Sequence, residues 1–491
     1  MFLKRRKITL AELYHNYLKR LLGNQTKHNT GHALDVVPFL THRTGRIKGN
    51  FNHVLGEFVR RICDLKLDYS EIAPPGYTFS REQNEQDEDN DNNLLISHLL
   101  SQVKVRNGDD EHALYRFLSE YIFQNESIKI IHPYMYNYIK VDKSDKNEFT
   151  KYGDFMRDIL ITDKDKFKEV FSNDQIDDIL THLLINQKNV LQERGPSKRS
   201  YSSLLPLITE LYEEDLLYLS NYKDYFIHSF SLISHFYVFM YISQLVFKFS
   251  SFTKANYNEL EPLYFTLDWE QLSRRRKAVE DLNSFKFILS KLDYFFPHIH
   301  TLSQLSHNKA NVKEYELGTS KKIEVLTYSK MKELLETKVL DEHDFLIELR
   351  TWMVDYTEIF RKEFKEEYTP EFTDIDGAFE ELFHLVDRGT SDTVSQKFGR
   401  NYEDLGANQF IKSRGSIGRV FNITHEFLLL LTAVSVKKER IPLNQLFAEY
   451  EKRGVLLDHY SKSEVVYTLD KLNLIDKKSD SGDAQYVKPV L

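Results

Sequence analysis

The sequence predicts a mainly α-helical protein, in which a multi-helix body is followed by a C-terminal winged-helix domain of three helices and a β-hairpin. Glycine (18) and proline (11) are scarce among the 491 residues, since average usage of about 7% and 5% would give roughly twice as many. Both residues break helices, so their scarcity indicates long helices and short loops. From residue 94 onward, apolar residues recur with the helical period. With 41% hydrophobic residues, the chain has ample material for a buried core.

The charge changes sign along the chain and divides it into four parts. The whole chain has a formal net charge of −8. Residues 1–80 form a basic N-terminal helical segment (+7), 81–93 an acidic linker, 94–400 an acidic α-helical body and 415–491 the winged-helix domain. The net charge is −13 over residues 93–411 and +3 over residues 412–491. Because the linker contains no aliphatic residue, burial cannot offset its ordering entropy. Any nucleic-acid surface is therefore expected to be local, and the basic ends could hold DNA.

The N-terminus is typical of an amphipathic helix rather than of a secretion signal. Thr9 can cap a helix over 10–21 whose leucines and tyrosines share one face. The basic run at 4–7 is either solvated or a phosphate contact. A signal peptide would need an apolar core and a small-residue cleavage site. The single cysteine, Cys63, allows no intramolecular disulfide, and we expect a cytoplasmic protein.

One segment has the length of a membrane span but not its usual composition. Residues 225–247 contain no Lys, Arg, Asp or Glu, as a transmembrane helix would. The segment nevertheless contains two histidines, a glutamine and four serines among many aromatic residues. Lysines flank it on both sides and give it no preferred orientation. We therefore expect a helix buried on nearly all faces, with no membrane contact.

The last 70 residues contain the signals of a winged helix. Thr424 can cap a first helix, and Pro442 precedes a second helix that stops at Gly454. Ser461 and Glu464 have the capping-box spacing for a third helix. Two β-like runs around a glycine-containing turn then predict a hairpin over 474–489. Short β-like runs are also expected at 263–267 and 323–328, and a loop-rich stretch at 390–415.

The candidate DNA-binding residues follow from this arrangement, because a winged helix places its third helix in the major groove and its wing on the backbone. On the third helix and the wing these residues are Lys462, Ser463, Tyr467, Lys471, Lys477 and Lys478. The basic run Arg274, Arg275, Arg276 and Lys277 is a further candidate for a phosphate or partner contact, or is a solvated helix face. Acidic residues lie among the lysines, and many winged helices bind proteins. DNA contact and protein docking therefore both stay open.

Familiar catalytic signatures are absent from the sequence. It lacks the G-x-x-x-x-G-K-[ST] phosphate loop and the H-E-x-x-H and G-x-S-x-G motifs. Cys63 has no defined histidine partner, which favours a buried thiol over a nucleophile. His298, His300 and His307 can in principle ligate a metal, but no carboxylate follows at a tight spacing. We expect no enzyme activity, no cofactor and no metal site.

Several stretches of the sequence carry a family resemblance. They are GRVFNITHEFLLLLTAVSVKKERIPLNQLFAEYEKRGV at 418–455, LDKLNLIDKKSDSGDAQYVKPVL at 469–491 and, upstream, 226–249 and 262–280. They resemble the DptG (DndG) family, accessory subunits of the bacterial DNA phosphorothioation-dependent restriction system. The resemblance implies a role in antiviral defence, in a complex that attacks DNA lacking the sulfur-for-oxygen modification. It implies DptF-like and DptH-like partners, the latter an ATPase or translocase, and it transfers no catalytic residue.

These patterns favour a non-catalytic restriction subunit, with a helical body that docks partner subunits and a winged-helix end that contacts double-stranded DNA or a partner. The alternative is a stand-alone winged-helix transcription regulator whose helical body senses a ligand or dimerises. Such a regulator would ordinarily be a dimer, and its recognition helix would have more arginine and fewer acidic residues. A third hypothesis is an enzyme whose nuclease residues are scattered along the chain.

Overall fold

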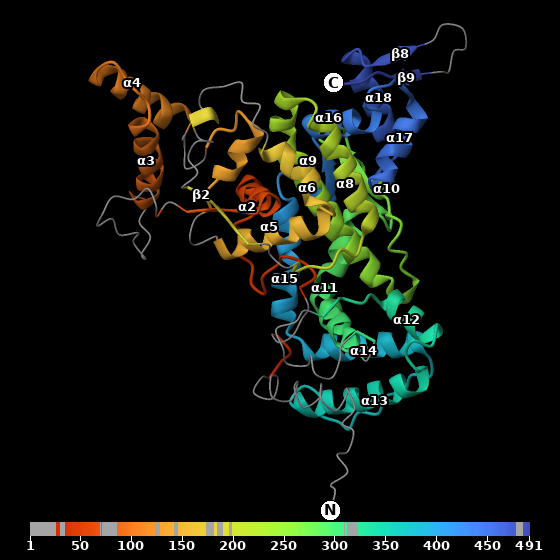
Figure 1. Ribbon diagram of the computed structural model, residues 1–491. Coiled ribbons are helices and arrows are strands. Elements are labelled where there is room, and N and C mark those ends of the chain that lie inside the picture. The colour runs from red at the N-terminus through yellow and green to blue at the C-terminus, as the bar shows by residue number, and fades with distance from the viewer. Residues whose placement is uncertain are drawn as a thin grey trace, which may run out of the picture.

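Helices form most of the structure, and small sheets join segments that are distant in the sequence (Figure 1). The computed structural model describes residues 26–29, 35–68, 70, 86–122, 128–141, 146–172, 181–183, 190–195, 199–308, 310–311, 323–477 and 485–491. The prediction of a mainly α-helical protein is confirmed. The helix expected at 10–21 lies outside the described residues.

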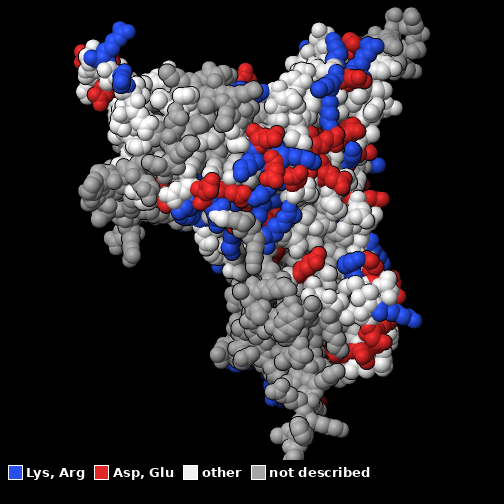
Figure 2. Space-filling model, in the orientation of Figure 1, with Lys and Arg blue, Asp and Glu red and all other residues white. Residues whose placement is uncertain are grey.

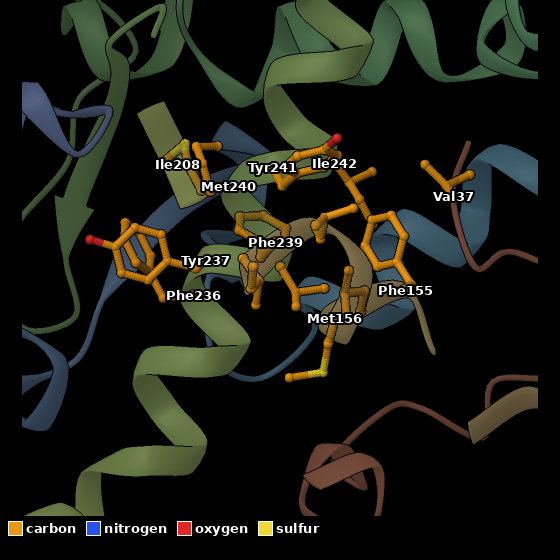
Figure 3. Close-up of a cluster of buried hydrophobic side chains, with 14 of the residues drawn as sticks. Val37, Phe155, Met156, Ile208, Phe236, Tyr237, Phe239, Met240, Tyr241 and Ile242 are labelled. Carbon is orange, nitrogen blue, oxygen red and sulfur yellow. The ribbon is translucent and has the colours of Figure 1, made fainter. Parts of the chain in front are cut away.

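The centre of the body is α9 (Lys223–Ser250), an apolar helix that packs against α8 (Pro206–Leu219) and α11 (Phe285–Ser306). Figure 3 shows its aromatic side chains among those of α8 and of α5 (Lys146–Leu160), where the rings of Tyr241 and Phe155 lie 5.6 Å apart. Among the described helices, α9 alone is long and apolar enough to cross a membrane, and 83% of its apolar window is buried inside the protein. The prediction of a buried core helix is confirmed.

The N-terminal half is organised around α2 (Phe51–Cys63), which packs closely on α5. A Cβ added at Gly56 would lie 2.6 Å from the Ile139 carbonyl oxygen, and one added at Gly153 would lie 2.7 Å from Glu57. At Gly153 the two helices therefore approach to a distance that only glycine permits, and Gly56 allows the same close approach of α2 to the chain at Ile139. Beside them lie η4 (Pro133–Tyr138), α6 (Lys164–Ser172) and the antiparallel strands β1 (Leu65–Leu67) and β2 (Leu191–Glu193).

Two helices project from this half as an arm, α3 (Gln86–Ser101) and α4 (Gly108–Phe117) (Figure 1). The amide of Asp110 donates a hydrogen bond of 2.8 Å to the side chain of Asn107, which caps α4. A π-helical turn, η2 (Leu118–Ile122), continues from α4. Because α3 begins at Gln86, part of the stretch expected to be a linker is helical.

A second group of helices surrounds α11 at the opposite end of the molecule (Figure 1). They are α12 (Tyr328–Glu336), α13 (Glu342–Ile359), α14 (Ile375–Gly389) and α15 (Asp392–Gly406), with η5 (Phe252–Lys254) beside them. The expectation of a loop-rich stretch at 390–415 is wrong, because α15 buries Phe398, Tyr402 and Leu405 at helical spacing. The β-like run at 323–328 is also not a strand: its last residues cap and begin α12.

A four-stranded sheet joins the body to the C-terminal region. Its order is β4 (Ile411–Ser413), β5 (Arg419–Ile423), β3 (Leu263–Leu267) and β7 (Val455–Leu457), with η7 (Gly415–Ile417) between β4 and β5. The strand expected at 263–267 is confirmed as β3, which runs parallel to β5 on one side and to β7 on the other. These pairings cross the boundary expected at 415.

The C-terminal region contains the three expected helices and the expected hairpin. The helices are α16 (His425–Val436), α17 (Leu443–Lys452) and α18 (His459–Lys471), and a three-stranded antiparallel sheet has the order β6 (Ile441–Pro442), β9 (Gln485–Val487) and β8 (Ile475–Lys477). Thr424 caps α16 as predicted. The cap of α18 is Asp458 rather than Ser461, because the Ser461 amide donates to the Asp458 carboxylate at 3.0 Å.

Candidate functional site

The carboxyl ends of the parallel strands β3, β5 and β7 meet at one edge of the sheet, where polar residues gather. Asp268, Trp269 and Glu270 follow β3, and the N-terminus of α16 follows β5. The N-terminus of α18 follows β7. Ligand sites of open α/β sheets form at this edge. The basic run 274–277 also follows β3. It therefore lies at the same edge of the sheet as the N-terminus of α18.

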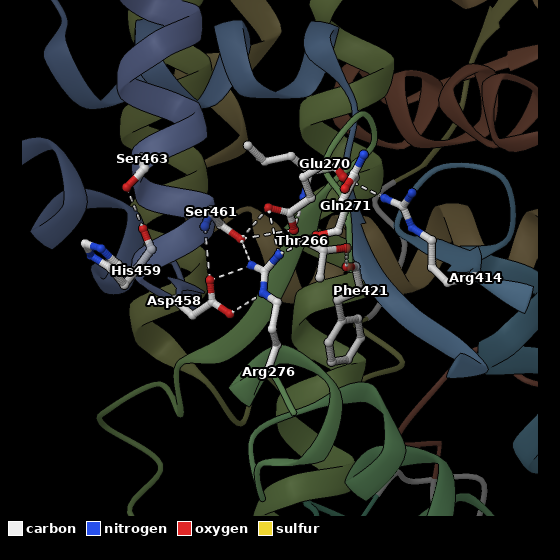
Figure 4. Close-up of polar contacts among 11 residues, drawn as sticks. Thr266, Glu270, Gln271, Arg276, Arg414, Phe421, Asp458, His459, Ser461 and Ser463 are labelled. Carbon is white, nitrogen blue, oxygen red and sulfur yellow. Dashed lines mark hydrogen bonds and ion pairs between the residues drawn. The ribbon is translucent and has the colours of Figure 1, made fainter. Parts of the chain in front are cut away.

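Arg276 is the central residue of this edge (Figure 4). Its guanidinium donates hydrogen bonds to both Asp458 carboxylate oxygens, from Nε at 2.8 Å and from Nη2 at 2.5 Å, and to Ser461 Oγ at 2.8 Å. Its Nη1 lies 3.2 Å from a Glu270 carboxylate oxygen and donates to the Gln271 carbonyl at 3.1 Å. Ser461 Oγ donates to the same Glu270 oxygen at 3.0 Å and lies 3.1 Å from the other. We call Arg276, Glu270, Asp458 and Ser461 the arginine clamp.

The clamp is buried, and the pKa values of its two carboxylates are shifted in opposite directions. The side chains of Glu270, Arg276 and Asp458 are only 2%, 5% and 6% exposed. Burial raises the pKa of Glu270, and Arg276 offsets only part of this effect. Burial alone would also raise the pKa of Asp458, but the bonds from Arg276 and from the Ser461 amide lower it. Since Arg276 and Ser461 each bond to both carboxylates, the clamp fixes the first turn of α18 against the body.

The expectation that Arg276 contacts DNA is therefore wrong. A guanidinium enclosed by two carboxylates and a hydroxyl is unavailable to a phosphate. The neighbouring Arg274, Arg275 and Lys277 are exposed, and Arg274 donates to the Ser416 carbonyl at 3.1 Å. Of the four cations in this run, Arg276 is thus buried in the clamp and the other three face solvent.

An aromatic pair lies at the surface of the same edge. The Trp269 indole, half-buried, stacks on the exposed His425 ring with centroids 3.5 Å apart. Lys412 pairs with Asp268, and Arg414 donates to the Leu267 carbonyl at 2.6 Å. Lys412 and Arg414 thus bind acceptors of the chain itself and stabilise the strand ends.

The outer face of α18 presents four residues at helical spacing, Tyr460, Ser463, Tyr467 and Lys471. The two tyrosines are 64% and 56% exposed, and the Lys471 ammonium lies 4.3 Å from the Tyr467 ring centroid. We call these four residues the α18 face. Three of them were expected from the sequence as DNA-binding residues, and Tyr460 is an addition.

The other sequence candidates lie apart from the α18 face. Lys462 points toward α17, where its ammonium lies 3.4 Å from Glu451 and 5.1 Å from the Phe447 ring centroid. Lys477 ends β8 opposite Gln485 of β9. Lys478 lies outside the described residues.

A second buried ion pair ties α17 to the body. Arg453, 1% exposed, donates to both Asp215 carboxylate oxygens of α8 at 2.9 and 2.7 Å, and Tyr237 of α9 donates to the same carboxylate at 2.5 Å. Glu449 also accepts from Arg453 at 2.8 Å. Together with the clamp and the β3–β7 pairing, this ion pair fixes the C-terminal helices rigidly on the body.

The histidines and the cysteine occupy packing positions. His298 and His300 lie in α11, and His298 Nδ1 is 2.9 Å from the Tyr328 hydroxyl. Among the described residues, no three His, Cys, Asp or Glu side chains gather as a metal site would require. Cys63 is buried, and this burial raises the pKa of its thiol to about 12, which agrees with the interpretation as a buried thiol.

Sequence reasoning missed Glu270, Trp269 and His425, and it misassigned Arg276. A signal was available, since each polar group directly follows a strand. However, β3 alone of the three parallel strands was expected from the sequence. Comparison with protein-family models gives no match to this chain, and comparison with curated proteins gives none either.

Proposed function

We propose that this chain is a non-catalytic subunit of a bacterial DNA phosphorothioation-dependent restriction complex, acting in cytoplasmic antiviral defence. In this role it docks partner subunits and uses a C-terminal winged helix to contact a partner or DNA. The observation that carries the proposal is the order of the C-terminal elements, α16, β6, α17, α18, β8 and β9, with β6, β9 and β8 in one antiparallel sheet. That order matches the helices and wing of a winged helix. The stretches that resemble the DptG family include all of these elements except most of α18.

The α18 face supports docking at the position of a recognition helix. Tyrosines are enriched where proteins bind one another, because they bury a large area and keep a polar end. Tyr460 and Tyr467 are the largest exposed side chains of α18. The arginine clamp holds this helix rigid, which lowers the entropic cost of binding.

Among the residues that the structure describes, a few exposed cations support a DNA contact. Lys471 lies on the α18 face, and Arg274, Arg275 and Lys277 lie at the neighbouring sheet edge. On the face shown in Figure 2, basic and acidic side chains mix in a central band and form no uniform basic surface. Any phosphate contact by this chain would therefore be local and strongly dependent on salt.

Co-expression with the ATPase subunit of such a system tests the proposal. We expect a complex that survives size-exclusion chromatography at moderate salt. A homodimer that shifts one palindromic duplex and binds no ATPase subunit would instead establish the transcription regulator.

A pair of variants then separates docking from DNA contact. Tyr467→Ser on the α18 face should weaken the partner complex, whereas Arg275→Glu and Lys277→Glu should weaken only duplex binding. Leu289→Ser, an exposed position on α11, is the control and should change neither. Loss of duplex binding by Tyr467→Ser with an intact partner complex would assign α18 to DNA.

A further inference from the structure

The α3–α4 arm exposes aromatic residues at its surface. Tyr115, Phe117 and Tyr121 are 36%, 41% and 59% exposed. The rings of Phe117 and Tyr121 stack with centroids 5.5 Å apart. No described residue of α4 is buried. Contiguous exposed aromatic surface is uncommon on a protein that works alone, and it marks interaction sites.

This exposure is not a consequence of a poorly packed arm. The arm has an inner side of its own, where Leu95 and Leu99 of α3 and Leu118 and Ile122 of η2 are almost fully buried. Phe117 and Tyr121 form a separate stripe with the four-residue spacing of a helix surface. The arm can therefore hold its shape while the aromatic stripe stays available.

The charge of the arm selects the class of partner. Residues 86–122 contain eight acidic and three basic residues. Asp109, Asp110 and Glu111 are exposed in the first turn of α4. Negative charge repels DNA phosphates and anionic lipid headgroups, and it attracts a basic protein surface. The Lys129 ammonium, 5.9 Å from the Tyr121 ring centroid, illustrates how such a ring receives a cation.

We propose that the α3–α4 arm docks a basic surface of a partner protein, with Phe117 and Tyr121 as anchors and the acidic first turn of α4 as the steering charge. The proposal rests on the proposed function, because it names a surface by which the subunit joins its complex. It adds a second docking surface, distant from the α18 face (Figure 1).

The test uses the full-length chain and the purified ATPase subunit from the co-expression experiment. Phe117→Ser combined with Tyr121→Ser should weaken the complex at least tenfold, as the loss of a central aromatic anchor does. The thermal midpoint should not change, because the side chains of Phe117 and Tyr121 are both exposed. Tyr294→Ser, which removes a tyrosine of 41% exposure from α11, is the matched control and should bind as the wild type does.

A second variant tests the charge. Asp109→Asn, Asp110→Asn and Glu111→Gln together should slow association at low salt, and the difference from wild type should vanish at high salt, because screening removes steering.

Each of the other outcomes contradicts either the arm proposal or the proposed function. If the wild type binds the ATPase subunit and the arm variants bind equally well, the arm is not the docking site, and the proposed function stands. If the wild type does not bind, the proposed function fails and the arm proposal fails with it. If the arm variants lose duplex binding or self-association instead, the occupant is DNA or a second copy, and the proposal of a basic partner protein is wrong.

Discussion

Replacement of Arg276 by methionine tests the arginine clamp, which fixes α18 on the body. Methionine keeps most of the apolar stem of the side chain but removes the guanidinium. The change leaves the carboxylates of Glu270 and Asp458, 2% and 6% exposed, facing each other across a site without a counter-ion. Ser461 loses its partner on Arg276 as well.

The expected cost follows from that burial. Removing one partner of a buried ion pair destabilises a protein by about 3–5 kcal/mol, because the remaining charge stays desolvated. The exposed neighbour Arg275 provides the control, since a surface substitution at such a site changes stability by about 0.5 kcal/mol or less. We therefore expect Arg276→Met to fall at least about 2 kcal/mol below Arg275→Met.

The assay is urea denaturation followed by tryptophan fluorescence. The chain has two tryptophans, and Trp269 stacks on His425 at the edge that contains the clamp. In a Trp352→Phe background the signal reports on this edge alone. Equal urea midpoints for Arg276→Met and Arg275→Met would refute the clamp.

The pH dependence provides an independent check of the same variant. The folded-state pKa of Glu270 is already raised by burial, and removal of Arg276 raises it further. An acid with a raised folded pKa destabilises the protein when it ionises, so this destabilisation is complete at neutral pH and is relieved as the pH falls through that pKa. The deficit of Arg276→Met should shrink as the pH falls from neutrality toward that pKa, and a deficit that grows would contradict the assignment.

The remaining predictions concern the buried groups of the body. Asp215→Asn should destabilise the protein by about 3 kcal/mol in urea denaturation because it leaves Arg453 buried without its bidentate partner, and the double variant with Arg453→Met should recover part of that loss. Burial lowers the pKa of His298 to about 3 and that of His235 to about 4, so the stability they provide in the neutral form is present above pH ~6.5 and is lost as the pH falls toward these values, by roughly 1.4 kcal/mol per pH unit for each histidine. His298→Leu should therefore flatten the dependence of the urea midpoint on pH between 6.5 and 5, and an unchanged slope would contradict this. Cys63 should react with a thiol reagent only in denaturant, and rapid reaction of the native protein would contradict its burial.

Local patterns predicted the elements that depend on short stretches of sequence. The apolar run of α9, the Thr424 cap of α16 and the hairpin strands β8 and β9 all follow from spacing within a few residues. The helix α15 was missed because its glycines and polar residues hide an apolar stripe that only its packing on α11 makes evident.

The sheet edge could not be predicted from the same information. The strand β7 has three residues, and its partner β3 lies nearly two hundred residues earlier in the chain, a pairing that no local period encodes. The same limit applies within the basic run. Arg275 and Arg276 are identical in type, and only the position of Asp458 and Glu270 decides which one is buried.

The position of β3 between two late strands also constrains when the protein can finish folding. β3 leaves the ribosome roughly 150 residues before β5 and still longer before β7, and such distant pairings form slowly. Both hydrogen-bonding edges of β3 therefore stay unpaired while the helices α11 to α15 are synthesised. Unpaired edges invite association between nascent chains. For this chain, a chaperone would therefore act mainly before the C-terminal region assembles onto β3, by shielding the unpaired edges of that strand.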